Sequence, residues 1–254
     1  MLNIMKRKQT VKGKDYPLSA NSKLASLEFS KAANWASQIY AVLKLHERHL
    51  CDRSVFQKLN QLLVKVYATD DTHALGAKKL FAGDVEMLTK LRLGHFGEWN
   101  VRLGIGVGIK MEPSTGKATI AISKFILSAN QFIDRARQIA LRFYVYLLDE
   151  EKELLKVEVT DDLLVDFNIA YKEIEAKFDF PPVSNGVLLL LGVHQLYLAT
   201  TDLRAVFASF DRRYYQANFM QALAIKDGKL FDYQKKVIDV AEVVNIPKVA
   251  WYQK

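Results

Sequence analysis

Residues 100–126 read NVRLGIGVGIKMEPSTGKATIAISKFI, and they hold the strongest structural signal in the chain. From Val101 to Met111 an apolar side chain occupies every second position. This period of two predicts a β-strand with one buried face. The turn-rich link Glu112–Gly116 has a length that suits a β-hairpin, so we expect Lys117–Ile126 to return as its partner strand.

Three glycines alternate with the apolar residues of this predicted strand. They are Gly104, Gly106 and Gly108. A dinucleotide-binding loop needs the pattern G-x-G-x-x-G between a strand and a helix, so a phosphate loop is disfavoured. Glycines at alternate strand positions remove the side chains from one face, and we therefore expect an aromatic ring, a backbone or another subunit to pack closely there.

Before this stretch the chain has a helical pattern. From about Lys23 to His49 apolar residues recur at three-, four- and seven-residue intervals, which predicts a long helix. A second helix is predicted from Ser54 to Tyr67, because Val55, Leu59, Leu62, Leu63 and Val66 form one apolar face. The break at 49–53 predicts an antiparallel helical hairpin, and one or two short helical turns follow within 77–91.

After this stretch the sequence indicates strands without intervening helices. Besides those already named, the predicted strands are Leu91–Trp99, Ile139–Leu148, Leu154–Val159, Leu163–Ile169, Ile174–Phe180, Val187–Leu198 and Tyr214–Ile225. Many short strands separated by turns are typical of an antiparallel sandwich. The fold class is therefore predicted as α+β, with the N-terminal helical hairpin packed on an antiparallel β-sandwich, immunoglobulin-like or similar.

Four segments follow from this pattern. Residues 1–22 are predicted to be a basic flexible tail, 23–90 a helical region, 91–230 the sandwich, and 231–254 a C-terminal arm. In the arm, Val237, Val240, Ala241 and Val244 have helical spacing, but the same region is also rich in strand-forming residues. The sequence therefore leaves both a helix and a strand open for the arm.

The positive charge lies at the N-terminal end. Residues 1–65 contain twelve Lys or Arg and four Asp or Glu, an excess equal to the whole chain's net charge of +8. The tail contributes Lys6, Arg7, Lys8, Lys12 and Lys14. Such an end could contact nucleic acid or an acidic partner, and it could equally be a solvated face.

A second group that could contact a partner mixes basic and aromatic side chains. It consists of Arg204, Arg212, Arg213, Tyr214 and Tyr215. Rings and guanidinium groups can stack on bases, and Arg and Tyr are also enriched at protein interfaces. We rank a protein interface or the edge of the core above nucleic acid.

Residues suited to catalysis or metal binding are few. His46 and His49 share a helix face, with Cys51 two positions further on, but no second ligand pair occurs elsewhere. Cys51 as a nucleophile would need a base that no motif supplies. We therefore predict no metal, no cofactor and no enzymatic activity.

The chain is also expected to be unexported and cytoplasmic, without a membrane span. No apolar signal region follows the basic N-terminal run, and the longest apolar run, Val187–Val193, is far too short to cross a bilayer. The single cysteine excludes an intramolecular disulfide and fits a reducing compartment.

Several loose motifs resemble those of a group of uncharacterised proteins of about 250 residues from the Bacteroidota lineage. They are Phe29-x-x-Ala32 before an alanine-rich helix, Asp52-Arg53 before the second helix, Gly76 followed by Gly83-Asp84-x-Glu86-x-Leu88, and Thr115-Gly116. The resemblance spans roughly residues 28–226. The chain departs from the group in its lysine-rich start and in residues 231–254. The resemblance implies an unexported bacterial protein and no particular activity, so no functional residues carry over.

The leading hypothesis is a non-enzymatic structural or interaction protein that assembles with copies of itself or docks a partner. A nucleic-acid-binding module using the basic N-terminal region is the alternative. A further alternative is a ligand-binding or enzymatic β-sandwich with its site among the loops.

Overall fold

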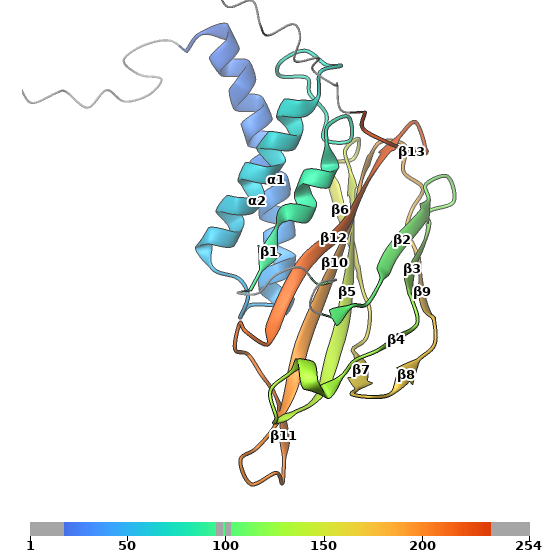
Figure 1. The fold of residues 1–254 in the computed structure, drawn as a ribbon. Coiled ribbons are helices and arrows are strands. Elements are labelled where there is room, and N and C mark those ends of the chain that lie inside the picture. The colour runs from blue at the N-terminus through green and yellow to red at the C-terminus, as the bar shows by residue number, and fades with distance from the viewer. Residues whose placement is uncertain (1–17, 95–98, 100–102, 235–254) are drawn as a thin grey trace, which may run out of the picture.

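The computed structural model describes residues 18–94, 99 and 103–234, and it shows three layers (Figure 1). Two long helices cover one face of an eight-stranded antiparallel sheet, and a three-stranded sheet covers the other face. The predicted α+β class, with a helical hairpin on an antiparallel sandwich, is confirmed.

The helical layer consists of α1 (Ala20–His46), α2 (Arg53–Thr69) and the 3₁₀ helix η1 (Val85–Lys90). Helix α1 begins three residues before the predicted boundary at Lys23, because the Ser19 side chain accepts a hydrogen bond from the Ser22 N–H and caps the first turn. Asp52 caps α2 in the same way. The predicted hairpin break between the two helices is therefore correct.

The large sheet has the order β1-β12-β10-β5-β6. In addition, β7 pairs with β5, β11 with β10 and β13 with β12. Its strands are β1 (Arg92–Leu93), β5 (Ala136–Asp149), β6 (Leu154–Val159), β7 (Leu163–Asp166), β10 (Gly186–Ala199), β11 (Val206–Ala208), β12 (Tyr215–Lys226) and β13 (Lys229–Phe231). Strands β5 and β10 are apolar at nearly every position because both of their faces are covered. For example, Tyr144 and Tyr146 pack under the helices, whereas Phe143 and Val145 face the small sheet.

A bulge at Met220 divides β12. Leu190 lies opposite Gln221 and Leu191 lies opposite Phe219, so Met220 has no partner in the register. One extra residue exchanges the two faces of a strand. Phe219 and Ala222 consequently both face the helices, although three positions separate them.

The small sheet has the order β2-β3-β9, and a two-stranded sheet, β4-β8, accompanies it. The strands are β2 (Val107–Glu112), β3 (Lys117–Ile122), β4 (Phe125–Ile126), β8 (Ala170–Tyr171) and β9 (Ile174–Asp179). A short 3₁₀ helix, η2 (Ala129–Gln131), precedes β5. The predicted hairpin around Glu112–Gly116 is confirmed, with Val107 opposite Ile122.

The predicted strand Val101–Met111 is too long at its N-terminal end. Leu103 is helical, Gly104 has a left-handed φ of +64°, and β2 begins only at Val107. Residues 101 and 102 lie outside the described residues. The predicted close-packed face is wrong at Gly104, where a Cβ would meet no atom within 4 Å, and of the three glycines only Gly108 belongs to the strand. A Cβ on Gly106 would lie 2.8 Å from Ser123 Oγ, so a side chain packs closely there.

The predicted tail and arm fall mostly outside the described residues. Residues 1–17 and 235–254 lie outside the described residues, and β13 accounts for Lys229–Phe231. Within the part of the chain that is described, no helix is long and apolar enough to cross a membrane.

Candidate functional site

The histidines and the cysteine at the end of α1 do not form a ligand set. His46 is exposed, with its ring centroid 5.8 Å from that of Tyr144, and His49 lies 4.3 Å from Phe210. Among residues 18–94, 99 and 103–234, no three His, Cys, Asp or Glu side chains could hold a metal ion together. Burial, together with the nearby carboxylates, raises the pKa of the Cys51 thiol to about 11. The thiol is then protonated at neutral pH and is a poor nucleophile.

The buried carboxylate of Glu47 fastens the end of α1 to the large sheet. Its side chain is fully buried and accepts hydrogen bonds from the hydroxyls of Tyr144 on β5 and Tyr215 on β12. The Arg142 guanidinium donates to the same carboxylate at 2.9 Å and binds Asp162 at 2.6 and 2.8 Å. Burial raises the pKa of Glu47, although Tyr144 and Arg142 oppose that shift. With both oxygens bonded and no exposed surface, Glu47 offers no place for a substrate.

The basic and aromatic residues predicted to contact a partner separate into two groups. Arg212 donates to Asp52 at 2.8 Å and to the His49 carbonyl at 3.2 Å, so it joins the sheet to the helical hairpin. Hydrogen bonds from Ser54 and Arg212 hold the pKa of Asp52 well below its usual range. Tyr215 belongs to the core through Glu47.

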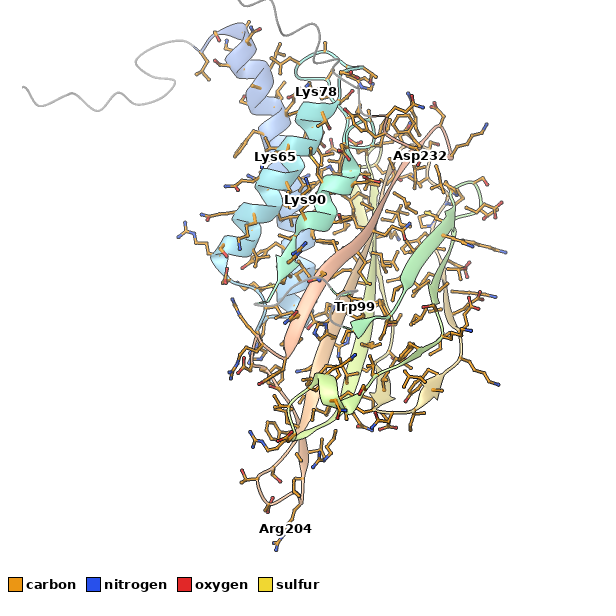
Figure 2. The ribbon with its side chains drawn as sticks, viewed as in Figure 1. Lys65, Lys78, Lys90, Trp99, Arg204 and Asp232 are labelled. Atoms are coloured by element: carbon orange, nitrogen blue, oxygen red, sulfur yellow. The ribbon has the colours of Figure 1, made fainter. Side chains whose placement is uncertain are left out.

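The remaining members of this set lie at the surface. Arg213 pairs with Asp211 at 2.5 Å and lies over the Tyr214 ring at 5.3 Å. Arg204 is exposed at the tip of the β10–β11 loop, as Figure 2 shows. The tail residues Lys6, Arg7, Lys8, Lys12 and Lys14 lie outside the described residues. Among the described residues, these predicted contacts therefore do not share one surface.

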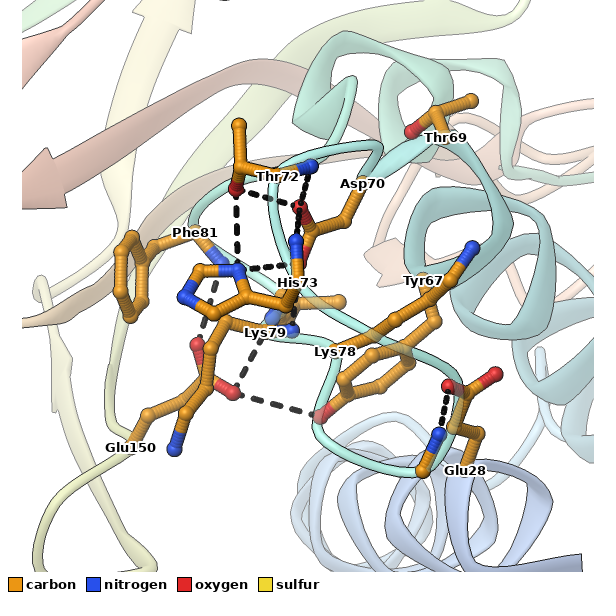
Figure 3. A network of polar contacts seen from close by, with 12 residues as sticks. Glu28, Tyr67, Thr69, Asp70, Thr72, His73, Lys78, Lys79, Phe81 and Glu150 are labelled. Carbon is orange, nitrogen blue, oxygen red and sulfur yellow. Dashed lines mark hydrogen bonds and ion pairs between the residues drawn. The ribbon is translucent and has the colours of Figure 1, made fainter. Parts of the chain in front are cut away.

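The loop between α2 and η1 is organised by a fully buried Asp70 (Figure 3). Its carboxylate accepts the backbone N–H of Thr72 at 2.9 Å and of Lys79 at 2.9 Å, the Thr72 hydroxyl at 2.7 Å, and His73 Nδ1 at 2.7 Å. Burial acts to raise the pKa of Asp70, but the hydrogen bonds from Lys79, Thr72 and His73 outweigh it, and the pKa is lowered.

Glu150, at the end of β5, holds the same loop from the other side. It accepts the backbone N–H groups of Leu80 and Phe81 at 3.0 Å each and the Tyr67 hydroxyl at 3.4 Å. Burial raises its pKa. Both carboxylates are thus occupied by the loop backbone and by neighbouring side chains, and the network in Figure 3 fixes a conformation instead of presenting reactive groups.

Replacing Asp70 with asparagine is expected to lower the free energy of unfolding by about 2 kcal/mol, because an amide N–H₂ would face the donors that now bind the second oxygen. Urea unfolding would measure the loss, and faster hydrogen exchange at the Lys79 amide would place it in the loop. Exposed Asp134→Asn is the control, with an expected change within about 0.5 kcal/mol. Since the folded pKa of Asp70 is lowered, its contribution is present above about pH 4 and is lost as the pH falls further. If Asp70→Asn were as stable as the wild type and the control, this role of Asp70 would be contradicted.

A basic surface on α2, η1 and β1 is the strongest remaining candidate for a binding site. Lys58, Lys65, Lys90 and Arg92 are exposed around a hollow of about 420 Å³, which we call the lysine hollow. Gln61, Leu62, Leu91 and Gly94 complete its lining. Figure 2 shows Lys65 and Lys90 projecting from the neighbouring elements α2 and η1.

A second hollow of about 340 Å³ adjoins the first and shares Lys90 and Arg92 with it. Thr89, Trp99, Val107, Asn218, Phe219 and Met220 also line it. Neither lining contains an aspartate or a glutamate. The charged residues of both linings are therefore all basic, which favours an anionic ligand.

The local sequence explains this charge. Lys58 and Lys65 are seven residues apart, which is about two helical turns, so both lie on one face of α2. Another face of α2 buries Leu59, Leu63 and Val66 in the core that the helices share with the large sheet. Helix α2 contains three basic residues and no acidic one, so this part of the charge can be recognised in the sequence alone. Lys90 and Arg92 lie beside Lys58 and Lys65 because of the tertiary fold.

Comparison with known proteins assigns no family. No protein-family model matches the chain, and no curated protein matches it in sequence. Among solved structures, the chain is similar to an ApaA protein from Bordetella pertussis, with 10% sequence identity and a TM-score of 0.26, over 48% of this chain and 93% of that one. A likeness at this level supports no argument about function, and the resemblance to the Bacteroidota group stays a prediction.

Proposed function

We propose that this chain is a non-enzymatic interaction protein that docks an acidic protein partner on the lysine hollow. The observation that carries the proposal is the hollow itself: four exposed cations from α2, η1 and β1 surround it, and no carboxylate lines it. The carboxylates of Glu47, Asp70 and Glu150 are all engaged within the fold, which supports the non-enzymatic part.

The lining favours an acidic protein segment over a nucleic acid. Binding of single strands relies on exposed aromatic rings on which bases stack. The aromatic side chains next to the hollow, Trp99 and Phe219, are buried. Leu62 lies between Lys58 and Lys65 and is half-buried, so an apolar side chain of the partner could pack there between charged contacts.

A fluorescently labelled 15-residue peptide of alternating glutamate and leucine would test the proposal by anisotropy. We expect binding that weakens as salt increases, since charge–charge contacts are screened. The double substitution Lys58→Glu and Lys65→Glu reverses two charges of the hollow. It is expected to weaken peptide binding at least about tenfold, equivalent to ~1.4 kcal/mol.

The matched control is the pair Lys124→Glu and Lys156→Glu, which changes net charge by the same amount at exposed positions outside both hollows. We expect it to change peptide binding less than about twofold, since distant exposed charges are screened. Equal weakening by both pairs would show a response to net charge alone and would refute the site. Tighter binding of a 15-nucleotide DNA strand, lost in the hollow variant, would favour the nucleic-acid alternative.

Self-assembly, the other form of the leading hypothesis, rests on the basic tail and the C-terminal arm, which lie mostly outside the described residues. Light scattering of the full chain and of a chain lacking residues 1–22 and 231–254 would test it. A monomer at high protein concentration in both cases would rule it out.

A further inference from the structure

Strand β6 is the last strand in the order of the large sheet, so only one of its two edges is paired among the described strands. Each residue from Leu154 to Val159 lies opposite a residue of β5, and the register between the two strands contains no bulge. The outer edge of β6 therefore presents an unbroken row of backbone groups, which a further strand can extend.

The hydrogen bonds around β5 show which backbone groups of β6 face outward. The Thr160 N–H, directly after β6, donates to the Phe143 carbonyl at 3.0 Å, so it points toward β5. On the other side of β5, the Glu150 N–H donates to the Asn185 carbonyl at 3.0 Å, which gives the same alternation. Because backbone direction alternates along an antiparallel strand, every second residue of β6 directs its N–H and C=O to the outer edge. These residues are Leu155, Val157 and Val159.

The two faces of β6 carry different side chains. Leu155 and Val157 are half-buried and pack against the core that the helices share with the large sheet. The opposite face carries Lys156 and Glu158, and both are exposed. A lysine on an edge strand usually disfavours pairing with another chain. Here a glutamate follows the lysine two positions later on the same face, so the edge carries one charge of each sign.

We infer that β6 pairs antiparallel with β6 of a second copy, about a two-fold axis at Val157. In this register Val157 lies opposite Val157 of the second copy, and Leu155 lies opposite Val159. All the outward backbone groups of both strands then have partners in the other copy. The two large sheets become one continuous sheet, and the apolar face of β6 continues across the axis.

The charges of β6 favour this register over its neighbours. Lys156 lies opposite Glu158 of the second copy, and the two-fold symmetry forms this pair twice. Both residues occupy non-hydrogen-bonded positions, where facing side chains approach most closely. Opposite charges directly across an antiparallel pair are favourable, and like charges are unfavourable. An axis at Lys156 or at Glu158 would place two like charges opposite each other.

This interface goes beyond the proposed acidic partner and is separate from it. Strands β1 and β6 end opposite edges of the large sheet, and the lysine hollow lies at the β1 edge. Dimerisation through β6 therefore leaves the hollow accessible. Since peptide binding and dimerisation are measured separately, failure of one proposal leaves the other standing.

The test measures the dimer dissociation constant of the full chain by sedimentation, with light scattering to confirm the mass. Glu158→Lys turns both cross-strand pairs into like-charge pairs and should raise this constant at least about tenfold. Adding Lys156→Glu to the same chain exchanges the two charges and restores opposite pairs. The double variant is therefore expected to return to within about threefold of the wild-type value.

The matched control is Glu173→Lys, which makes the same change of net charge at an exposed position outside β6. It should change the dissociation constant less than about twofold. A full chain that is monomeric at high protein concentration would overturn the inference, as would a dimer that Glu158→Lys does not weaken. Equal weakening by Glu173→Lys, or no recovery in the double variant, would show that Lys156 and Glu158 do not face each other across the axis.

Discussion

Replacing Glu47 with alanine is expected to lower the free energy of unfolding by about 3 to 5 kcal/mol, the range for removing one partner of a buried ion pair. The change leaves the Arg142 guanidinium and the hydroxyls of Tyr144 and Tyr215 without their common acceptor. It also removes the contact that joins the end of α1 to two strands of the large sheet. Urea unfolding, followed by circular dichroism, measures the loss.

Exposed Glu173→Ala is the control, with an expected change within about 0.5 kcal/mol. Glu47→Gln should cost less than Glu47→Ala, because the amide oxygen still accepts one hydrogen bond. Burial raises the folded pKa of Glu47, so the folded state binds a proton more tightly than the unfolded state. The stability of wild type relative to Glu47→Gln should therefore fall as the pH rises from about 4.5 through the folded pKa. A loss below about 1 kcal/mol for the alanine variant would show that the cluster is not a main link.

Gly116→Ala is expected to destabilise the protein by about 2 to 5 kcal/mol, from two separate effects. Gly116 has a left-handed φ of +74°, which costs an ordinary residue about 1 to 2 kcal/mol. A Cβ there would also lie 1.9 Å from the Phe180 carbonyl oxygen, and the backbone shift that relieves this overlap adds about 1 to 3 kcal/mol. The Phe180 N–H donates to the Gly116 carbonyl at 2.9 Å, so the turn cannot move away without losing that bond.

Gly104→Ala separates the two effects. Gly104 has a similar φ of +64°, but a Cβ there would meet nothing within 4 Å. We therefore expect only the backbone cost of about 1 to 2 kcal/mol. Thermal unfolding of both variants under one condition gives the difference, and equal losses would show that the Phe180 contact contributes nothing.

The sequence predicts several strands of both sheets well, because these strands are recognised by local patterns. Alternation or continuous apolar runs locate β9 and β10 within one residue at each end, and β6 is predicted at its observed bounds, Leu154–Val159. The same rule fails at residues 103–106. Leu103 and Ile105 are buried as the pattern requires, but the left-handed Gly104 interrupts the extended chain between them. Alternation of apolar residues indicates burial, and here burial occurs without a strand.

The candidate sites were harder to predict because each joins distant segments. The sequence places Glu47 within a charged run at a helix end, and nothing local indicates that Tyr144 and Tyr215 lie opposite it. Lys58 and Lys65 share a helix face by spacing alone. Their combination with Lys90 and Arg92 requires η1 to pack beside α2, which depends on the loop held by Asp70.

The position of β12 has a consequence for synthesis on the ribosome. This strand lies between β1 and β10, yet it is nearly the last to be made, and its residues Ala217 and Asn218 pair with Leu93 and Arg92, more than a hundred positions earlier. Until residues 215–226 emerge, one edge of the apolar strand β10 is unpaired and the helices have an incomplete sheet beneath them. An unpaired apolar strand edge is a site of aggregation. Nascent chains stalled before Tyr215 are therefore expected to need chaperone protection that the finished chain does not.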